Sequence, residues 1–171
     1  LIYTTVGLRN WRAFKDQEIG MAMCPGNLHQ AVLMDFPVSL GDYQYTQSPD
    51  DPCVIQMISC PYGETLGQPQ AEQYKQARYT MLGRQFSDYE ADIRTHLSGM
   101  LGPKHFNFDR DVASITVNRW AHGYTVAGPG DSAAVGRQPF GRITIANSDS
   151  APAADAIEAM MMGHRAVGEL S

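Results

Sequence analysis

The chain lacks features that define several large classes of protein. Its 171 residues carry a net charge of −5, and no block of Lys and Arg stands out along them. Because binding to a phosphate backbone needs clustered cations, we expect no nucleic-acid partner. No apolar run approaches the roughly 20 residues that a membrane-spanning helix requires, so we also expect no transmembrane segment.

The chain also has few cysteines, and it lacks the glycine motif of dinucleotide-binding folds. The three cysteines, Cys24, Cys53 and Cys60, follow no zinc-ligand spacing, so no metal site is predicted. No Gly-x-Gly-x-x-Gly follows a predicted strand, so any pyrophosphate cradle has to come from elsewhere. The chain opens with Leu1 in a strand-like run, and we expect this start to lie within a larger polypeptide.

The pattern of apolar residues predicts a mixed α/β fold of the α+β kind. Residues 70–101 repeat apolar side chains at three- and four-residue steps, which is typical of helices. Within this region, Ser87 and Glu90 have the spacing of a capping box that begins a second helix. The other expected elements are strands at 2–8, 21–24, 30–36, 53–59, 112–124 and 142–146, and helices at 10–15 and 154–170.

The composition changes near residue 112. Strands, loops and a helical pair precede this position, and a single strand–loop–strand–turn–helix unit follows it. We therefore predict two parts, residues 1–111 and 112–171.

The stretch from residue 141 to the start of the last helix combines features of a ligand site. A short apolar run ends in Ser148 and Asp149, passes through a turn of small residues and enters a helix. Small side chains let a ligand approach the backbone, and the free N–H groups of the first helical turn attract an electron-rich atom. Asp149 can accept a hydrogen bond from a ribityl or ribose hydroxyl, or it can simply cap the turn.

This stretch resembles the C-terminal flavin motif of the FAD-dependent amine oxidase superfamily. Three further stretches resemble its spermidine dehydrogenase-like branch: Tyr-Thr-Thr-Val-Gly-Leu-Arg-Asn-Trp-Arg-Ala-Phe at 3–14, Asn-Arg-Trp-Ala-His-Gly-Tyr at 118–124 and Gly-Arg-Gln-Pro-Phe-Gly-Arg-Ile at 136–143. Together with Asp-Phe-Pro-Val-Ser-Leu-Gly at 35–41, they spread the similarity over most of the chain.

The resemblance implies a fold, a cofactor and the residues that contact it. The chain would be the C-terminal part of a two-domain fold, with residues 1–111 in the substrate-binding domain and 112–171 returning to the FAD-binding domain. Asp149 and Ser148 would contact the ribityl–pyrophosphate portion of FAD. The start of the last helix would face the flavin N1–O2 edge, through Asp155, Ala156, Ile157, Glu158, Ala159 and Met160.

The resemblance also implies catalytic and substrate-binding side chains. Trp120, His122 and Tyr124 alternate, so on a strand they would form one aromatic wall beside the flavin; a packed core strand gives the same pattern. Asp35 would attract a cationic amine, and Trp11 would stack on it, although loop solvation and core packing explain the same residues.

The reaction implied is transfer of a hydride from the α-carbon of a small, polyamine-like amine to FAD. Without the dinucleotide fingerprint, the chain is expected to act with an N-terminal FAD-binding chain or fragment that carries Gly-x-Gly-x-x-Gly. The alternative is a non-catalytic structural subunit with a degenerate amine oxidase fold. A weaker third hypothesis is a stand-alone α+β binding domain. The compartment stays open between periplasm and cytoplasm.

Overall fold

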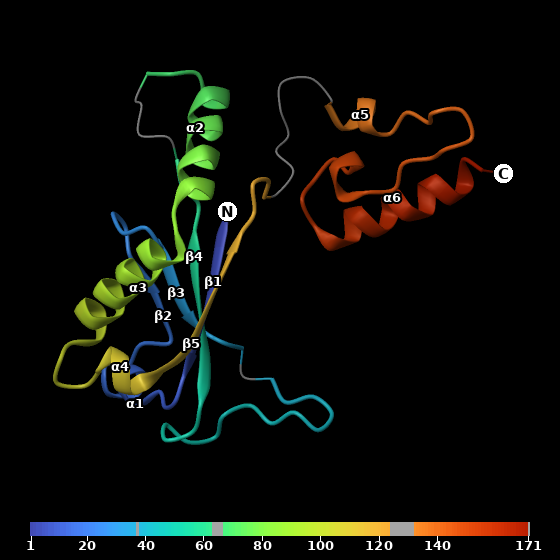
Figure 1. Cartoon of the computed structure of the whole chain (residues 1–171). Coiled ribbons are helices and arrows are strands. Elements are labelled where there is room, and N and C mark those ends of the chain that lie inside the picture. Colours follow the sequence, from blue (N-terminus) through green and yellow to red (C-terminus); the bar gives the residue numbers. More distant parts are fainter. Residues whose placement is uncertain (37, 63–66, 124–131, 171) are drawn as a thin grey trace. The chain divides into compact units, whose positions relative to one another are not determined.

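The chain forms two compact units, Leu1–Ala121 and His122–Ser171 (Figure 1). The computed structural model describes residues 1–36, 38–62, 67–123 and 132–170. The division falls later than the boundary predicted from composition, because the strand that begins at Val112 pairs along the first strand of the sheet. The predicted boundary at 111/112 therefore lies inside the first compact unit.

The first unit is built on a five-stranded antiparallel sheet in the order β2-β3-β4-β1-β5. Its strands are β1 (Ile2–Leu8), β2 (Met21–Met23), β3 (Ala31–Met34), β4 (Cys53–Ser59) and β5 (Val112–Arg119). The predicted strands at 2–8 and 53–59 are confirmed. Both strands bury alternate residues, as expected where one face of a sheet is covered.

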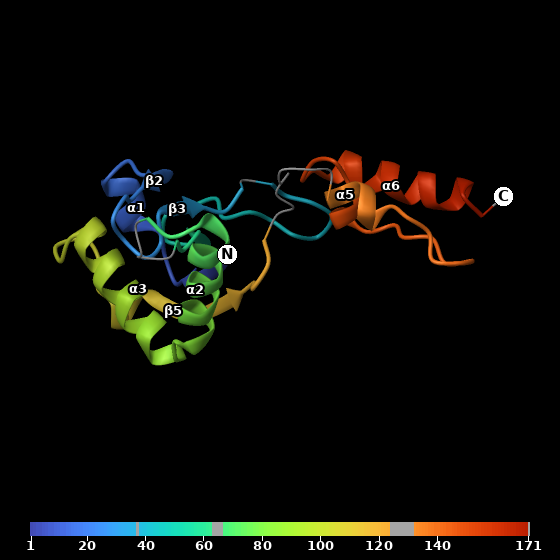
Figure 2. The same cartoon turned by 90° about the horizontal axis from the view of Figure 1, so that it is seen from above.

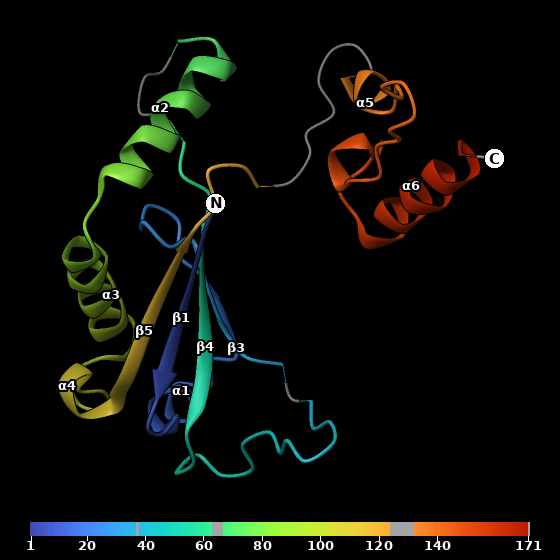
Figure 3. The same cartoon turned by 45° about the vertical axis from the view of Figure 1, so that its right-hand side comes forward.

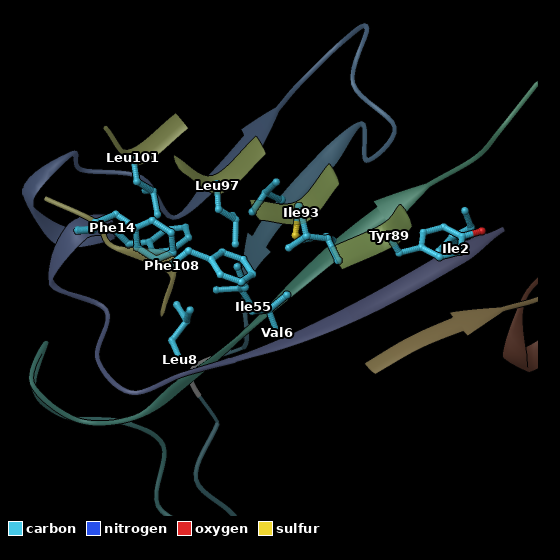
Figure 4. Close-up of a cluster of buried hydrophobic side chains, with 14 of the residues drawn as sticks. Ile2, Val6, Leu8, Phe14, Ile55, Tyr89, Ile93, Leu97, Leu101 and Phe108 are labelled. Atoms are coloured by element: carbon cyan, nitrogen blue, oxygen red, sulfur yellow. The ribbon is translucent and has the colours of Figure 1, made fainter. Parts of the chain in front are cut away.

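Helices cover one face of this sheet: α1 (Arg12–Asp16), α2 (Gln70–Gly83), α3 (Phe86–Leu101) and α4 (Phe108–Asp111) (Figure 3). The core between the two layers is shown in Figure 4. Tyr89, Ile93, Leu97 and Leu101 project from one side of α3 toward the strands, and all four are fully buried. The three- and four-residue spacing seen in the sequence is the cause, because it places these side chains on one face of the helix.

The start of α3 differs from the prediction. The capping box is formed by Gln85 and Asp88, with Asp88 Oδ2 accepting from the Gln85 amide at 2.9 Å. The predicted pair of Ser87 and Glu90 lies inside the helix, so its spacing was right and its position was two residues late. Phe86 is exposed in the first turn.

The second unit contains α5 (Ser132–Gly136), a 3-10 helix η1 (Ser148–Ser150) and α6 (Ala156–Gly168) (Figure 2). The final helix is confirmed, beginning two residues later than predicted. The predicted strand at 142–146 is wrong: these residues make one isolated bridge, between Phe140 and Ile143. A strand needs a neighbour along its length, and the described residues of this unit offer none.

Arginines rather than apolar side chains hold the second unit together. Arg165 on α6 donates to the carbonyl oxygens of Arg137, at 2.9 Å, and of Ile145. Arg137 in turn donates to the carbonyl of Ser150 at 3.1 Å. The buried residues among those described here are all small: Ala133, Ser150, Ala151 and Ala166.

Candidate functional site

A cavity of about 560 Å³ lies in the first unit where β1 and β4 meet the loop that follows β3. Its walls include Gly7 and Leu8 at the end of β1 and Cys53 and Val54 at the start of β4. The volume is in the range of small-molecule sites, and most of the exposed wall is apolar with a few polar groups. The cavity can therefore receive a small organic ligand.

Asp35 provides a carboxylate in the wall of this cavity. The Asp35 amide donates to the carbonyl of Val54 at 3.0 Å, which continues the pairing of β3 with β4 by one residue. One carboxylate oxygen accepts from the Phe36 amide at 2.9 Å. A carboxylate fixed in this way offers a cation a defined negative partner. Asp35, the residue predicted to bind substrate, thus lies in the cavity wall.

Two tyrosines line the same cavity, Tyr43 and Tyr45. A tight turn presents them: Leu40 and Tyr43 exchange backbone hydrogen bonds of 3.1 Å, and Gly41 takes a φ of 59° that favours glycine. Aromatic faces beside a carboxylate are suited to an ammonium group. The wall thus combines both kinds of attraction that a cationic amine requires.

Cys53 and Tyr45, which both line the cavity, form a hydrogen-bonded pair. Burial raises the pKa of the Tyr45 hydroxyl, and the neighbouring Cys53 raises it further. Burial likewise raises the pKa of the Cys53 thiol, whereas the hydrogen bond with Tyr45 lowers it by a smaller amount. Both groups are therefore neutral at pH 7, and the thiol is not an activated nucleophile.

Trp11 supports the cavity from outside its wall. Its indole Nε1 donates to Thr46 Oγ1 at 2.9 Å, and Thr46 is a wall residue. The Trp11 amide also donates to the carbonyl of Pro49 at 2.9 Å. The structure thus brings Asp35 to the cavity and places Trp11 behind it, where it holds the loop rather than lining the site.

Of the three residues predicted as an aromatic wall, the two that the structure describes, Trp120 and His122, lie outside β5. β5 ends at Arg119, so Trp120 follows the strand and is 58% exposed. His122 is exposed and belongs to the second unit, and Tyr124 lies outside the described residues. The predicted strand at 112–124 was therefore too long, and strand alternation does not align Trp120 with His122.

Asp149 and Ser148, predicted to contact the cofactor, lie in η1 rather than at a strand end. Asn147 begins this turn, and its side-chain oxygen accepts from the Ser150 amide at 3.1 Å. Ser150 Oγ donates to the Asn147 carbonyl at 2.6 Å, and Ser150 is fully buried. Asp149 and Ser148 are both exposed on this small turn.

The start of α6 is capped by Asp155, whose Oδ1 accepts from the Glu158 amide at 2.8 Å. The first N–H groups of a helix have no partner within it, and this cap satisfies one of them. Ala156 and Ile157 lie in the exposed first turn, where backbone amides have no acceptor within the helix, whereas Ala159 donates to the Asp155 carbonyl at 3.2 Å. Met160 is 75% exposed one turn further on. The helix start thus presents two amides and a carboxylate.

Sequence reasoning missed the tyrosines and Thr46, because residues 42–52 read as a polar loop. The signal available was the presence of Tyr43 and Tyr45 beside Asp42, Asp50 and Asp51. Aromatic residues in an acidic loop are unusual for mere solvation and indicate a binding surface.

Comparison with known proteins finds a likeness in structure but not in sequence. No family model matches the chain, and no curated protein matches its sequence. A solved structure of putrescine oxidase, a double mutant redesigned in cofactor binding, matches 99% of the chain with a TM-score of 0.58 and 17% identity. The match covers 34% of that protein, so the chain spans about a third of its length.

The match shows that the chain shares its fold with part of putrescine oxidase. The mixed α/β architecture with an antiparallel sheet is therefore confirmed, and the coverage is consistent with a C-terminal portion.

Within the described part of the chain, no helix is both long and apolar enough to cross a membrane. The same residues bring no three His, Cys, Asp or Glu side chains together as a metal site.

Proposed function

We propose that the chain is part of a flavin-dependent amine oxidoreductase. The observation that carries this proposal is the cavity of the first unit, where Asp35 and two tyrosines meet in a fold shared with putrescine oxidase. The resemblance of residues 3–14, 118–124 and 136–149 to the amine oxidase superfamily supports it independently. The narrower proposal is a spermidine dehydrogenase-like enzyme.

The geometry of the cavity favours an amine with more than one nitrogen. A carboxylate stabilises a nearby ammonium and raises its pKa, whereas a nitrogen whose α-carbon loses hydride reacts in its neutral form. Asp35 is therefore suited to the nitrogen that is not oxidised. A diamine or polyamine has such a second nitrogen, and Tyr43 and Tyr45 can cover its charge.

FAD is the cofactor proposed, and the start of α6 fits part of it. FAD would supply the hydride acceptor. The exposed amides of Ala156 and Ile157 can donate to its electron-rich edge, while the Asp155 carboxylate suits a hydroxyl donor such as the ribityl chain. Asp149 and Ser148, exposed on η1, offer further groups for hydroxyls or phosphate.

The pyrophosphate cradle is assigned to a partner region. The chain spans about a third of the neighbour's length and carries no Gly-x-Gly-x-x-Gly. We therefore propose that it works with an FAD-binding chain or segment that supplies this fingerprint.

The test of the amine site compares two acidic residues of the same loop region. Asp35→Asn removes one of the two carboxylates that line the cavity, the other being Asp51, and Asp42→Asn removes one outside the lining. We expect Asp35→Asn to weaken the binding of putrescine to this chain by about tenfold, the scale of one charge-assisted hydrogen bond. Isothermal titration calorimetry measures this change, and Asp42→Asn should leave the affinity within about twofold. Equal losses of affinity in both variants would indicate a general effect of charge and would contradict the assignment of Asp35 to the amine site.

One observation favours the alternative of a non-catalytic subunit. The Asp155 cap places negative charge at the helix start, where the growing charge of a reduced flavin would need a positive pole. The two functions differ in the absorbance of the purified assembly, which shows a flavin band only if the site is retained. A colourless assembly that still binds putrescine through Asp35 would favour the subunit.

A further inference from the structure

A second cavity in the first unit, of about 420 Å³, lies at the other end of β1 from the cavity that contains Asp35. Ile2 lines the second cavity, whereas Gly7 and Leu8 line the first, and no described residue lines both. The turn between β2 and β3 forms one wall, and the end of α2 with the first turns of α3 forms another (Figure 1). A ligand in the second cavity would therefore leave the first one free.

Asp92 presents a carboxylate to the second cavity from α3. Its side chain is 32% exposed, although its Oδ2 atom is buried and accepts no hydrogen bond from the described residues. Oδ2 lies 3.5 Å from Nδ1 of His29, which is fully buried and bonded through Nε2 to Thr4 Oγ1 at 2.8 Å. Since Oδ2 is directed at this histidine, the exposed part of the carboxylate is available to a ligand.

Arg84, at the end of α2, presents a positive charge to the same cavity. Its carbonyl oxygen accepts from Arg119 Nη1 at 3.1 Å, and its guanidinium carbon lies 6.0 Å from the centre of the Tyr89 ring. Among the residues that the structure describes, no carboxylate forms an ion pair with Arg84. A guanidinium held beside an aromatic ring and left without a carboxylate partner is suited to a planar carboxylate from a ligand.

Two side-chain amides add neutral groups to the wall. Gln30 Oε1 accepts from the Cys60 amide at 2.8 Å, which fixes the orientation of its side chain and leaves the NH2 group as a donor. Asn27 lies in the turn between β2 and β3, where Gly26 takes a φ of 87° that favours glycine. The second cavity thus offers hydrogen bonds as well as two opposite charges.

We propose that the second cavity binds an α-amino acid with an uncharged side chain. Arg84 and Asp92 line one cavity without pairing with each other, and a zwitterion satisfies both of them. An anion alone would meet the carboxylate of Asp92, and a cation alone would meet the charge of Arg84. In this arrangement Arg84 holds the carboxylate of the amino acid and Asp92 holds its ammonium group.

The rest of the lining determines which amino acids fit. Arg84 and Asp92 are the only charged residues among the described ones that line the second cavity, so a charged ligand side chain would find no partner there. Ile2, Ala77 and Met81 supply apolar surface, and the amides of Gln30 and Asn27 supply polar groups. The ligand side chain is therefore uncharged.

Isothermal titration calorimetry of the full chain with each of the uncharged natural L-amino acids tests for this ligand. We expect saturable binding of at least one of them. We also expect that amino acid to raise the thermal midpoint of the chain, because a ligand that binds only the folded state stabilises it. Binding of none would overturn the proposal.

Removing the charges of the ligand one at a time tests whether a zwitterion is required. For an amino acid that binds, the amine without the carboxylate and the acid without the ammonium group should each bind at least about tenfold more weakly, because each loses a charge-assisted contact. For L-leucine, these analogues are 3-methylbutylamine and 4-methylpentanoate. An analogue that bound as tightly as the amino acid would make the site one for a single charge and overturn the proposal.

Variants of the wall test which residues hold the two charges. Arg84→Gln and Asp92→Asn should each weaken binding of the amino acid at least about tenfold. Arg78→Gln on α2 and Glu90→Gln on α3 remove charges outside the lining and should change the affinity less than about twofold. Arg84→Gln should also bind the amine analogue as the unmodified chain does, whereas a general disturbance of the fold would weaken both ligands. Unchanged amino-acid affinity in Arg84→Gln or Asp92→Asn would overturn the proposal.

Asp35→Asn separates the two cavities. This variant should leave the amino-acid affinity within about twofold, because Asp35 lines only the first cavity. A loss of amino-acid binding in Asp35→Asn would place the ligand in the first cavity and overturn the inference. Failure of putrescine to bind would contradict the amine site and leave the second cavity standing.

Discussion

The two units of this chain treat their apolar residues in opposite ways. In the first unit, α3 points Ile93, Leu97 and Leu101 inward, and each is fully buried against the sheet. In the second, α6 points Met160 and Val167 outward, and its arginine inward. Both helices repeat apolar residues at three- and four-residue steps. This spacing defines an apolar face of the helix, but it does not determine whether that face is buried. The first unit has a core of its own, whereas the large apolar side chains of α6 are exposed in the second unit.

The largest predicted effect is on stability, and it contrasts a buried side chain of α3 with an exposed one of α6. Leu97→Ala should lower the free energy of unfolding of the first unit by about 2–5 kcal/mol, because Leu97 is fully buried and leaves a cavity. Met160→Ala should change the stability of the chain alone by less than about 0.5 kcal/mol, because its side chain is solvated. Urea denaturation followed by circular dichroism measures both. Similar losses in the two variants would mean that α6 packs within the chain.

A second prediction concerns Asp111, a buried carboxylate of the first unit. Its oxygens accept from Arg110 at 2.7 Å, from the Asn107 amide at 2.8 Å and from Asn10 at 3.1 Å. The bond with Arg110 is the first cause that lowers the pKa of Asp111 to about 2, against burial, which raises it. Since an unfolded Asp has a pKa of about 3.9, the ionised carboxylate contributes about 2 kcal/mol at neutral pH.

The sign of this contribution sets the pH window. A lowered folded-state pKa stabilises the fold above the unfolded value, and the gain is lost as the pH falls from about 5 toward about 2. Asp111→Asn should therefore cost about 2 kcal/mol at pH 7 and much less near pH 2. Asp109→Asn is the exposed control in the same turn, with a side chain 75% exposed. An equal cost at both pH values would contradict the account.

A third prediction concerns two buried histidines, His29 and His96, the second of which belongs to α3. His29 is fully buried, with Nε2 hydrogen-bonded to Thr4 Oγ1 at 2.8 Å and Nδ1 3.5 Å from Asp92 Oδ2. Burial lowers the pKa of His29 and of His96, while Asp92 opposes both shifts and Arg84 adds to that of His29. Each neutral histidine therefore resists protonation in the folded state.

Acid should weaken the first unit through these histidines. A histidine whose folded pKa lies below the unfolded value, about 6.5, lets stability fall as the pH drops below that value. We expect the thermal midpoint to decrease between pH 7.5 and pH 5, and His96→Phe to make this decrease shallower. His164→Phe, on the exposed face of α6, is the control and should not alter the slope. If the thermal midpoint of His96→Phe fell with pH as steeply as that of the unmodified chain, His96 would not be a cause of the acid sensitivity.

The smallest expected effect is at Trp11. Trp11→Phe removes the 2.9 Å hydrogen bond to Thr46 while keeping most of the packing, and one such bond contributes about 1 kcal/mol. The loop that carries Tyr45 and Thr46 should become more mobile, which amide hydrogen exchange detects in that segment. Faster exchange spread evenly over the first unit would indicate a packing role for Trp11 instead.

Much of the fold was predictable from local patterns. Residues 2–8 and 53–59 are rich in β-branched side chains and form strands at those bounds, and the spacing of apolar residues along α3 predicted its buried face. The error at 142–146 has a physical reason: an apolar, β-branched run forms a strand only where another strand is available to pair.

The site was less predictable than the fold. Asp35 was identified as a substrate residue because of its charge, and it lies in the cavity wall. Tyr43 and Tyr45 reach the same wall through a loop turn at Gly41, which depends on backbone geometry that residue type alone does not determine. The roles of Asp149 and the start of α6 stay predictions, because they depend on a cofactor and a partner region.

The most direct test is the absorbance spectrum of the assembly purified through this chain, combined with its content of FAD after denaturation. We predict one FAD per copy of the chain in this assembly. An assembly without FAD would contradict the proposal that the chain is part of a flavin-dependent amine oxidoreductase.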